Sequence, residues 1–363
     1  MGATFVYVSC AEDGEIASYA LGPSGTLSAI ARVKVAKGVM PMAVSPDRRF
    51  LYVVSRPAPY TIHVLAIDRD TGALTRLSTS PLPASLPYIS FDRSGRFLLG
   101  ASYHENLVTV TAVGADGRVA PAPLQTIPVG RNAHSVRVDL SNRFVFVPTL
   151  GSDAVFLFRF DAATGALVSN TPPLCLTPSG AGPRHFEISS DNRFVYVLCE
   201  MTGAIVTFAL NAESGLLTEA GSVSGLAPDC VLVPGVPRGV PQSGQTARNV
   251  ERDIWAADVH LAPNGKFLYA SERTESTLNV FAVDRSTGKL TYRSTHATEA
   301  QPRGFAVDPL GRFLVASGER SDSISHYHID DVTGALRLAG RLSAGKGGNW
   351  VEIVHFATTS TER

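Results

Sequence analysis

The chain has 363 residues, of which 32 are basic and 32 acidic, so its formal net charge is zero. A balanced charge creates no long-range field toward nucleic acid or an acidic membrane, and neither partner is expected. The length leaves open either two or three domains or one large all-β architecture.

The N-terminal segment predicts a strand that begins at Thr4, without the basic and apolar regions of a signal peptide. The apolar stretches have the length of strands and are interrupted by charge, so none is expected to span a membrane as a helix. The four cysteines form no CxxC motif, which favours a reduced, cytoplasmic compartment; they are Cys10, Cys175, Cys199 and Cys230.

One sequence phrase recurs along the whole chain: a turn, a basic residue, a phenylalanine and an apolar run. Its phenylalanines are Phe5, Phe50, Phe97, Phe144, Phe194, Phe267 and Phe313. Successive copies are 45, 47, 47, 50, 73 and 46 residues apart. Apart from the one long interval, this is the period of a propeller blade.

A second phrase, a polar loop ending in glycine and an apolar residue, predicts a hairpin in each unit. It occurs at 68–74, 161–167, 211–217, 284–290 and 331–336, with looser copies at 22–27 and 114–119. The glycine supplies the positive φ that such a hairpin requires. The runs between the phrases are short and rich in Val, Ile, Phe and Tyr, which predicts about four antiparallel strands per unit.

The C-terminal run 350–356 predicts an extra strand that pairs with the N-terminal one and closes the ring. The sequence therefore predicts an all-β, seven-bladed β-propeller with four antiparallel strands per blade. It forms one domain over 1–357, followed by a tail at 358–363. The long interval is assigned to an inserted loop near 226–252, rich in Pro and Gly, which either caps a site or decorates the surface.

The repeat register predicts where polar side chains gather. Residues ten and nine before each phenylalanine, and six after it, should meet at one end of the propeller. Inner strands usually carry small or apolar residues. Here the positions before the phenylalanine include His134, Arg184, His185, Asp258 and Arg303. The positions six residues after it include Arg56, Glu200, Arg273 and Glu319.

Such a ring of charges forms either a polar site or a network of ion pairs. Single members also have structural interpretations: His185 could pack against a neighbouring strand, and Asp258 with His260 could be a hydrogen-bonded pair. Trp255 and Trp350 are typical of blade packing. No phosphate-binding glycine loop, GxSxG elbow or HExxH helix occurs. Asp258 and His260 alone predict no metal, and no cofactor is expected.

Several phrases resemble those of one known family. They are GPRH at 182–185, IWAADVH at 254–260, QPRGF at 301–305, His134 with Ser135, and the SPDxRFLYV phrase at 45–53. In order and spacing they are similar to the propeller-type lactonases, which include bacterial 6-phosphogluconolactonases and fungal 3-carboxy-cis,cis-muconate lactonizing enzymes. The resemblance extends from the first strand to Phe356, and the 226–252 insertion is the main departure. It implies a reactive group made of His134, Arg184 and Glu200.

We therefore expect a lactonase that hydrolyses 6-phosphogluconolactone or an unphosphorylated aldonolactone. Glu200 or His134 would act as general base, and Arg184 with Arg303 would hold the developing negative charge. Further residues would orient the substrate; they are His185, Asp258 and Arg273. Candidates for binding a phosphate are Arg56, Arg273, Arg303 and Arg320.

Two alternatives remain open from the sequence. One is a muconate-type lactonizing cycloisomerase, whose carboxylated substrate would suit the same arginines. The other is a non-catalytic propeller that binds proteins, which would present an apolar patch instead of a charged pocket. A closed propeller has no free sheet edge, so a monomer is expected.

Overall fold

The computed structural model describes residues 2–238 and 249–357 and contains seven antiparallel sheets of four strands. From inner to outer strand, the first sheet is β28 (Gly348–Phe356), β1 (Ala3–Cys10), β2 (Glu15–Leu21) and β3 (Leu27–Lys34). The second is β4 (Val39–Val44), β5 (Phe50–Ser55), β6 (Thr61–Ile67) and β7 (Leu74–Pro81). The third is β8 (Tyr88–Phe91), β9 (Phe97–Ser102), β10 (Leu107–Ala112) and β11 (Gln125–Pro128). The fourth is β12 (Arg137–Val138), β13 (Phe144–Thr149), β14 (Ala154–Asp161) and β15 (Ala166–Leu176), with the 3-10 helix η1 (Leu150–Ser152).

The remaining three sheets follow the same order from inner to outer strand. They are β16 (Pro183–Ile188), β17 (Phe194–Cys199), β18 (Ala204–Leu210) and β19 (Leu217–Ser224); β20 (Ala256–Leu261), β21 (Phe267–Glu272), β22 (Thr277–Val283) and β23 (Leu290–Ala297); β24 (Gly304–Val307), β25 (Phe313–Ser317), β26 (Ser323–Ile329) and β27 (Leu336–Ser343).

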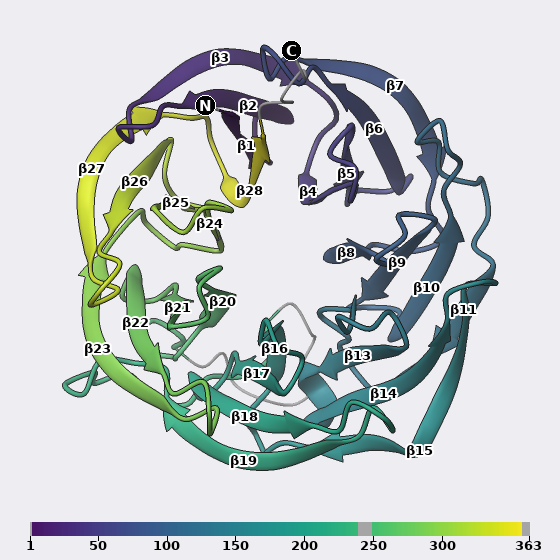
Figure 1. Cartoon of the computed structure of the whole chain (residues 1–363), viewed down its shortest axis with the longest axis vertical. Coiled ribbons are helices and arrows are strands. Elements are labelled where there is room, and N and C mark those ends of the chain that lie inside the picture. Colours follow the sequence, from purple (N-terminus) through teal and green to yellow (C-terminus); the bar gives the residue numbers. More distant parts are fainter. Residues whose placement is uncertain (1, 239–248, 358–363) are drawn as a thin grey trace, which may run out of the picture.

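The sheets stand as blades around a central axis, and the first and last strands, β1 and β28, lie in the same blade (Figure 1). β28 pairs with β1 from Ala3 opposite Phe356 to Cys10 opposite Gly348. The predicted seven-bladed fold and its closure by the terminal strands are confirmed. The predicted tail at 358–363 and residues 239–248 of the insertion lie outside the described residues.

The two recurring phrases meet between neighbouring blades. Each repeat phenylalanine packs against the hairpin glycine of the next blade, so Phe144 lies beneath Gly215. A Cβ on Gly215 would come within 2.1 Å of the Phe144 ring, and the φ of this glycine is +70°. The same contact recurs around the ring between Phe5 and Gly72, Phe50 and Gly117, Phe97 and Gly165, Phe194 and Gly288, Phe267 and Gly334, and Phe313 and Gly25.

Four inner strands, β4, β16, β20 and β28, have an irregular register against the neighbouring strand. In β16 the register shifts between Pro183 and His185, and in β20 between Ala256 and Val259. A β-bulge turns side chains away from strict alternation. The predicted site residues His185 and Asp258 lie at these two bulges. Within the described ranges, no helix has the length and apolarity needed to cross a membrane.

Candidate functional site

One end of the central channel opens into a pocket of about 240 Å³, which we call the arginine pocket. It lies where strands β5, β9, β17 and β21 end and where β8, β20 and β24 begin. Its lining residues are Arg56, Pro87, Tyr103, His104, His134, Glu200, Arg238, Trp255, Arg273 and Arg303.

Among the described lining residues, Glu200 is the single carboxylate, and it is 5% exposed. Its Oε2 accepts hydrogen bonds from Arg184 Nε and Arg273 Nη2, each at 2.8 Å. Burial raises the pKa of Glu200, but the charges of Arg273 and Arg184 outweigh burial and hold this pKa below its usual value. Glu200 is therefore an anion held in place by two guanidinium groups.

Arg184 is completely buried and lies behind Glu200, outside the pocket lining. Its Nη1 donates to the carbonyl oxygen of Ala257, and its own carbonyl accepts a hydrogen bond from Ser135 at 2.6 Å. Burial and the nearby Arg273 lower the pKa of Arg184 to about 9. The sequence placed Arg184 in the reactive group; the structure places its Nε on Glu200 and leaves its Nη2 buried without a hydrogen-bond partner, so its part in the reaction stays a prediction.

His134 provides an uncharged imidazole in the pocket wall. Burial is the main reason that its pKa lies well below 6.5, and the charge of Arg184 lowers it further. Its Nδ1 is buried without a hydrogen-bond partner, and the ring packs edge-on against Tyr103 and His185. A neutral imidazole can accept a proton at physiological pH.

Trp255 lies between two guanidinium groups. The Cζ atoms of Arg238 and Arg273 are 3.7 and 3.8 Å from its ring centroid. Arg238 belongs to the 226–252 insertion, where it donates to the carbonyl of Val250 and accepts a hydrogen bond from Tyr103. Sequence reasoning missed Arg238 because the insertion has no repeat register, and it assigned Trp255 to blade packing.

Positive charge predominates in the arginine pocket. Among the described lining residues, four arginines face one carboxylate, which leaves three positive charges in excess. Burial, and then the charge of Arg303, lowers the pKa of Arg56 to about 10. The Nε of Arg303 is buried without a partner, and its Nη1 lies 3.6 Å from Glu319. Arg320, another predicted phosphate ligand, is exposed and does not line the pocket.

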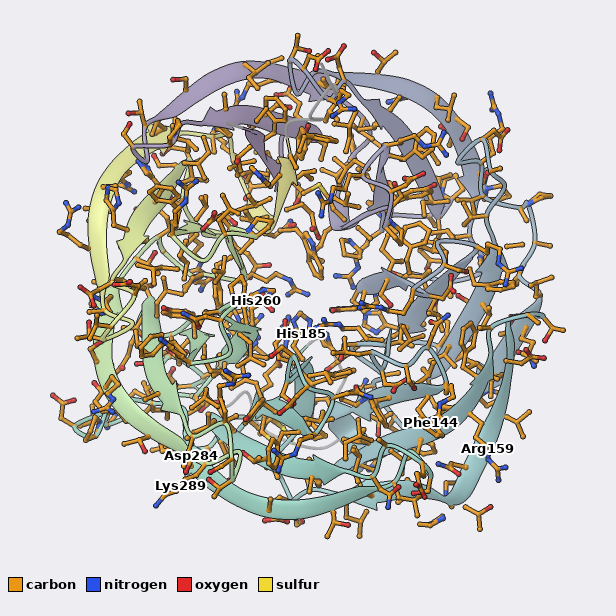
Figure 2. The ribbon with its side chains drawn as sticks, viewed as in Figure 1. Phe144, Arg159, His185, His260, Asp284 and Lys289 are labelled. Atoms are coloured by element: carbon orange, nitrogen blue, oxygen red, sulfur yellow. The ribbon has the colours of Figure 1, made fainter. Side chains whose placement is uncertain are left out.

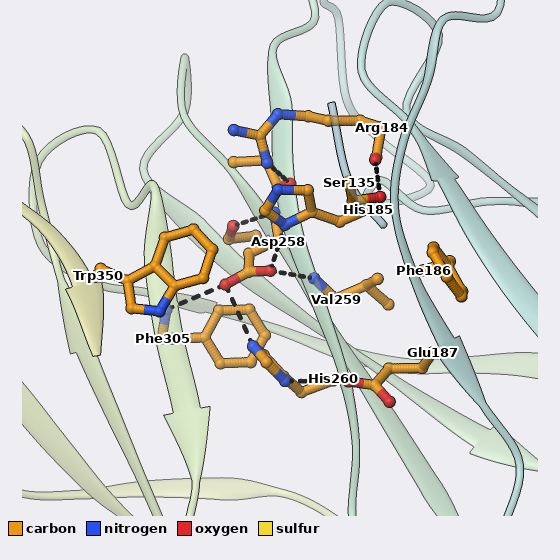
Figure 3. A network of polar contacts seen from close by, with 12 residues as sticks. Ser135, Arg184, His185, Phe186, Glu187, Asp258, Val259, His260, Phe305 and Trp350 are labelled. Atoms are coloured by element: carbon orange, nitrogen blue, oxygen red, sulfur yellow. Dashed lines mark hydrogen bonds and ion pairs between the residues drawn. The ribbon is translucent and has the colours of Figure 1, made fainter. Parts of the chain in front are cut away.

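His185 and Asp258 do not join this pocket, although the register predicted them at the same end. The Nδ1 of His185 lies 2.8 Å from Asp258 Oδ1, and Asp258 Oδ2 lies 3.1 Å from His260 Nε2 (Figure 3). His185 and His260 both lie beside the central axis (Figure 2). Asp258 lines a second pocket at the opposite end of the channel, and it lies within the irregular stretch of β20. The expectation of one shared end is therefore wrong for Asp258.

The pair Asp258 and His260 is not arranged as a metal site. His260 lies between Asp258 and Glu187, and these carboxylates outweigh the effect of burial and raise its pKa to about 10. Both ring nitrogens then carry protons, so neither can bind a metal. Within the described part of the chain, no group of three or more His, Cys, Asp or Glu side chains could hold a metal ion.

Comparison with known proteins gives one consistent family. Residues 5–353 match the family model described as lactonase, 7-bladed beta-propeller. A 6-phosphogluconolactonase of Serratia proteamaculans is 37% identical over 349 residues, which cover 96% of this chain and 98% of that protein. A 6-phosphogluconolactonase of Pectobacterium carotovorum is 36% identical with the same coverage.

Solved structures share the fold over nearly the whole chain. A periplasmic gluconolactonase of Pseudomonas aeruginosa superposes with a TM-score of 0.82 at 25% identity, covering 98% of this chain and 99% of that one. A protein from Lactobacillus plantarum superposes with a TM-score of 0.83 at 24% identity, covering 98% and 100%.

Proposed function

Because the chain belongs to the family of seven-bladed β-propeller lactonases, we propose that it hydrolyses a sugar-derived lactone in the arginine pocket. The observation that carries this proposal is the pocket itself, where a neutral imidazole faces a cluster of guanidinium groups. The excess of positive charge favours an anionic substrate, and 6-phosphogluconolactone is the form that we propose. The curated relatives are named 6-phosphogluconolactonases, and Arg56 and Arg238 can together hold the phosphate of that substrate.

In the proposed reaction, His134 takes a proton from a water molecule as the water oxygen bonds to the lactone carbonyl carbon. Arg273 and Arg303 stabilise the negative charge that forms on the carbonyl oxygen. The bond between this carbon and the ring oxygen then breaks, and His134 returns the proton to the ring oxygen. The product is an open-chain acid, which releases a proton at neutral pH.

Glu200 and Arg184 act as positioning residues in this proposal. A carboxylate that already accepts two guanidinium hydrogen bonds is a weak base, which favours His134 over Glu200 for proton transfer. Glu200 instead fixes the donor direction of Arg273 and compensates its charge. Arg184 in turn fixes Glu200 from behind.

The proposed enzyme is a cytoplasmic monomer that needs no cofactor. Its four cysteines are free, which suits a reducing compartment, and the strand pairing of the closed ring supports the monomer.

The test is acid release in a pH-stat from a panel of 6-phosphogluconolactone, glucono- and galactonolactone, and a muconolactone. We expect opening of 6-phosphogluconolactone far above its spontaneous rate, with smaller increases for the unphosphorylated sugars. The excess should be lost in His134→Asn and kept in His328→Asn, which changes a histidine of β26 outside the pocket lining. If no lactone opens above background, hydrolysis is wrong, and muconate cyclisation and protein binding become the functions to test.

A further inference from the structure

A second pocket, of about 360 Å³, opens at the opposite end of the central channel from the arginine pocket. All seven inner strands, from β4 to β28, contribute to its wall. Its charged residues are Arg137, Glu187, Asp258, His260 and Glu352. The proposed hydrolysis uses none of them, so this pocket needs a separate explanation.

Four of these five charges compensate one another. Glu187 Oε1 lies 3.0 Å from Arg137 Nη1 and 3.2 Å from His260 Nδ1. His260 Nε2 lies 3.1 Å from Asp258 Oδ2. The two cations and two anions therefore form one chain of contacts across neighbouring inner strands, part of which is visible in Figure 3.

Glu352 is the fifth charge and has no such compensation. Its Oε1 accepts a hydrogen bond from Trp350 Nε1 at 2.9 Å, and no ion pair to Glu352 is formed by the described residues. When Glu352 is ionised, the pocket therefore carries one negative charge in excess. The two ends of the channel thus have opposite polarity.

Aromatic rings line the same pocket as this carboxylate. Trp350 and Tyr88 line the pocket with their ring centroids 5.5 Å apart, and Phe305 packs edge-on against His260. Aromatic faces attract ammonium groups through the ring quadrupole, most strongly where water is excluded. A carboxylate without a cation beside such rings favours an organic cation as ligand.

We propose that this pocket binds a small organic cation, whose protonated or quaternary ammonium group lies between Glu352 and the rings of Trp350 and Tyr88. Binding there does not depend on hydrolysis at the other end, so the two proposals can fail separately. A pocket of this volume is within the range of small-molecule sites.

The affinity for such a cation should rise with pH. Burial raises the pKa of Glu352 to about 7, although a hydrogen bond from Trp350 and the charge of His260 act against burial. The ionised fraction of this carboxyl then rises about tenfold between pH 6 and pH 8, and only the ionised form attracts the cation. The groups around Glu352 are Trp350 on its own strand, Asp258 and His260 on β20, Arg137 on β12, Glu187 on β16 and Tyr88 on β8.

The two tryptophans of the chain allow a direct test, because one lines each pocket. In Trp255→Phe, the remaining fluorescence comes from Trp350 alone. This variant is titrated with choline and, separately, with 3,3-dimethylbutan-1-ol, which has the same shape without the charge. Isothermal calorimetry with the unaltered chain provides a second measurement.

We expect saturable binding of choline, at least tenfold weaker binding of the neutral alcohol, and about tenfold tighter choline binding at pH 8 than at pH 6. Glu352→Gln should reduce the affinity at least tenfold and remove the pH dependence. Glu213→Gln, which removes an exposed charge on an outer hairpin, should change neither. Thermal melting checks that both variants are folded. Equal binding of alcohol and choline to the unaltered chain, or no saturable binding of choline, overturns the proposal even if Glu352→Gln does not fold.

Discussion

Arg184 and Arg273 donate to the same oxygen of Glu200, so two buried cations share one carboxylate 2.8 Å away. Glu200→Gln removes the carboxylate that pairs with both guanidinium groups and leaves them buried without an ion-pair partner among the described residues. We expect a loss of about 3–5 kcal/mol in the free energy of unfolding, the range for a broken buried ion pair. Guanidinium chloride unfolding measures this loss, with Glu213→Gln as the exposed control. Equal stability of Glu200→Gln and the control would contradict the arrangement.

The pH dependence of hydrolysis should report the neutral state of His134. Because burial and nearby arginines hold its pKa well below 6.5, the imidazole is already a free base across the neutral range. The value of kcat/KM should therefore stay flat from pH 8 down to pH 6 and fall only in more acidic solution. His134→Asn should lower kcat about 10²- to 10⁴-fold, the usual contribution of a general base. A fall in kcat/KM centred near pH 6.5 would contradict this assignment.

Arg238 should discriminate between phosphorylated and unphosphorylated lactones. Arg238→Met keeps an unbranched side chain over Trp255 but removes the charge, so we expect KM for 6-phosphogluconolactone to rise about tenfold, as for a lost charged hydrogen bond. KM for gluconolactone should change little. Arg252→Met, an exposed arginine of the same insertion, is the matched control. A similar rise of KM for both lactones would assign Arg238 to the sugar ring instead of the phosphate.

The contact between Phe144 and Gly215 should be sensitive to a single methyl group. Gly215→Ala places a Cβ 2.1 Å from the Phe144 ring at a φ of +70°, whereas Gly180→Ala places one at a φ of +74° with nothing within 4 Å. Both variants thus carry a similar backbone strain, and the difference between their free energies of unfolding measures the clash with the Phe144 ring. We expect Gly215→Ala to be less stable by about 1–3 kcal/mol than Gly180→Ala in chemical unfolding. If both variants lose the same free energy of unfolding, the loss comes from the strained φ alone and not from a clash with Phe144.

Stability should also decline in alkaline solution because of His260. Its pKa is raised to about 10 in the folded protein, against an ordinary value of 6.5, by the carboxylates of Asp258 and Glu187. A raised pKa of a cationic group stabilises the fold fully below pH 6.5, and this stabilisation is lost as the pH rises toward 10. His260→Gln should therefore show a smaller decline in the free energy of unfolding between pH 7 and pH 10 than the unaltered chain does. An identical decline would contradict the ion pairs of His260.

The fold could be predicted from the sequence because the contacts between blades recur. Each blade has a phenylalanine equivalent to Phe144, and this ring packs against a glycine of the next blade equivalent to Gly215. Both phrases therefore repeat with the period of the blade. The register also brings His134 and Glu200 to one end of the channel. It failed for Asp258 because a bulge is an extra residue in one strand, and no local residue pattern announces it. Arg238 could not be predicted, since its position depends on the path of an insertion that has no counterpart in the repeat.

Closure of the ring by β28 and β1 has a consequence for biosynthesis. The blade that contains β1 lacks its inner strand until β28 has been translated. During that time β1 exposes an unpaired, apolar edge of the kind that recruits other strands. Nascent chains stalled before residue 348 should therefore depend on chaperones far more than the released protein does.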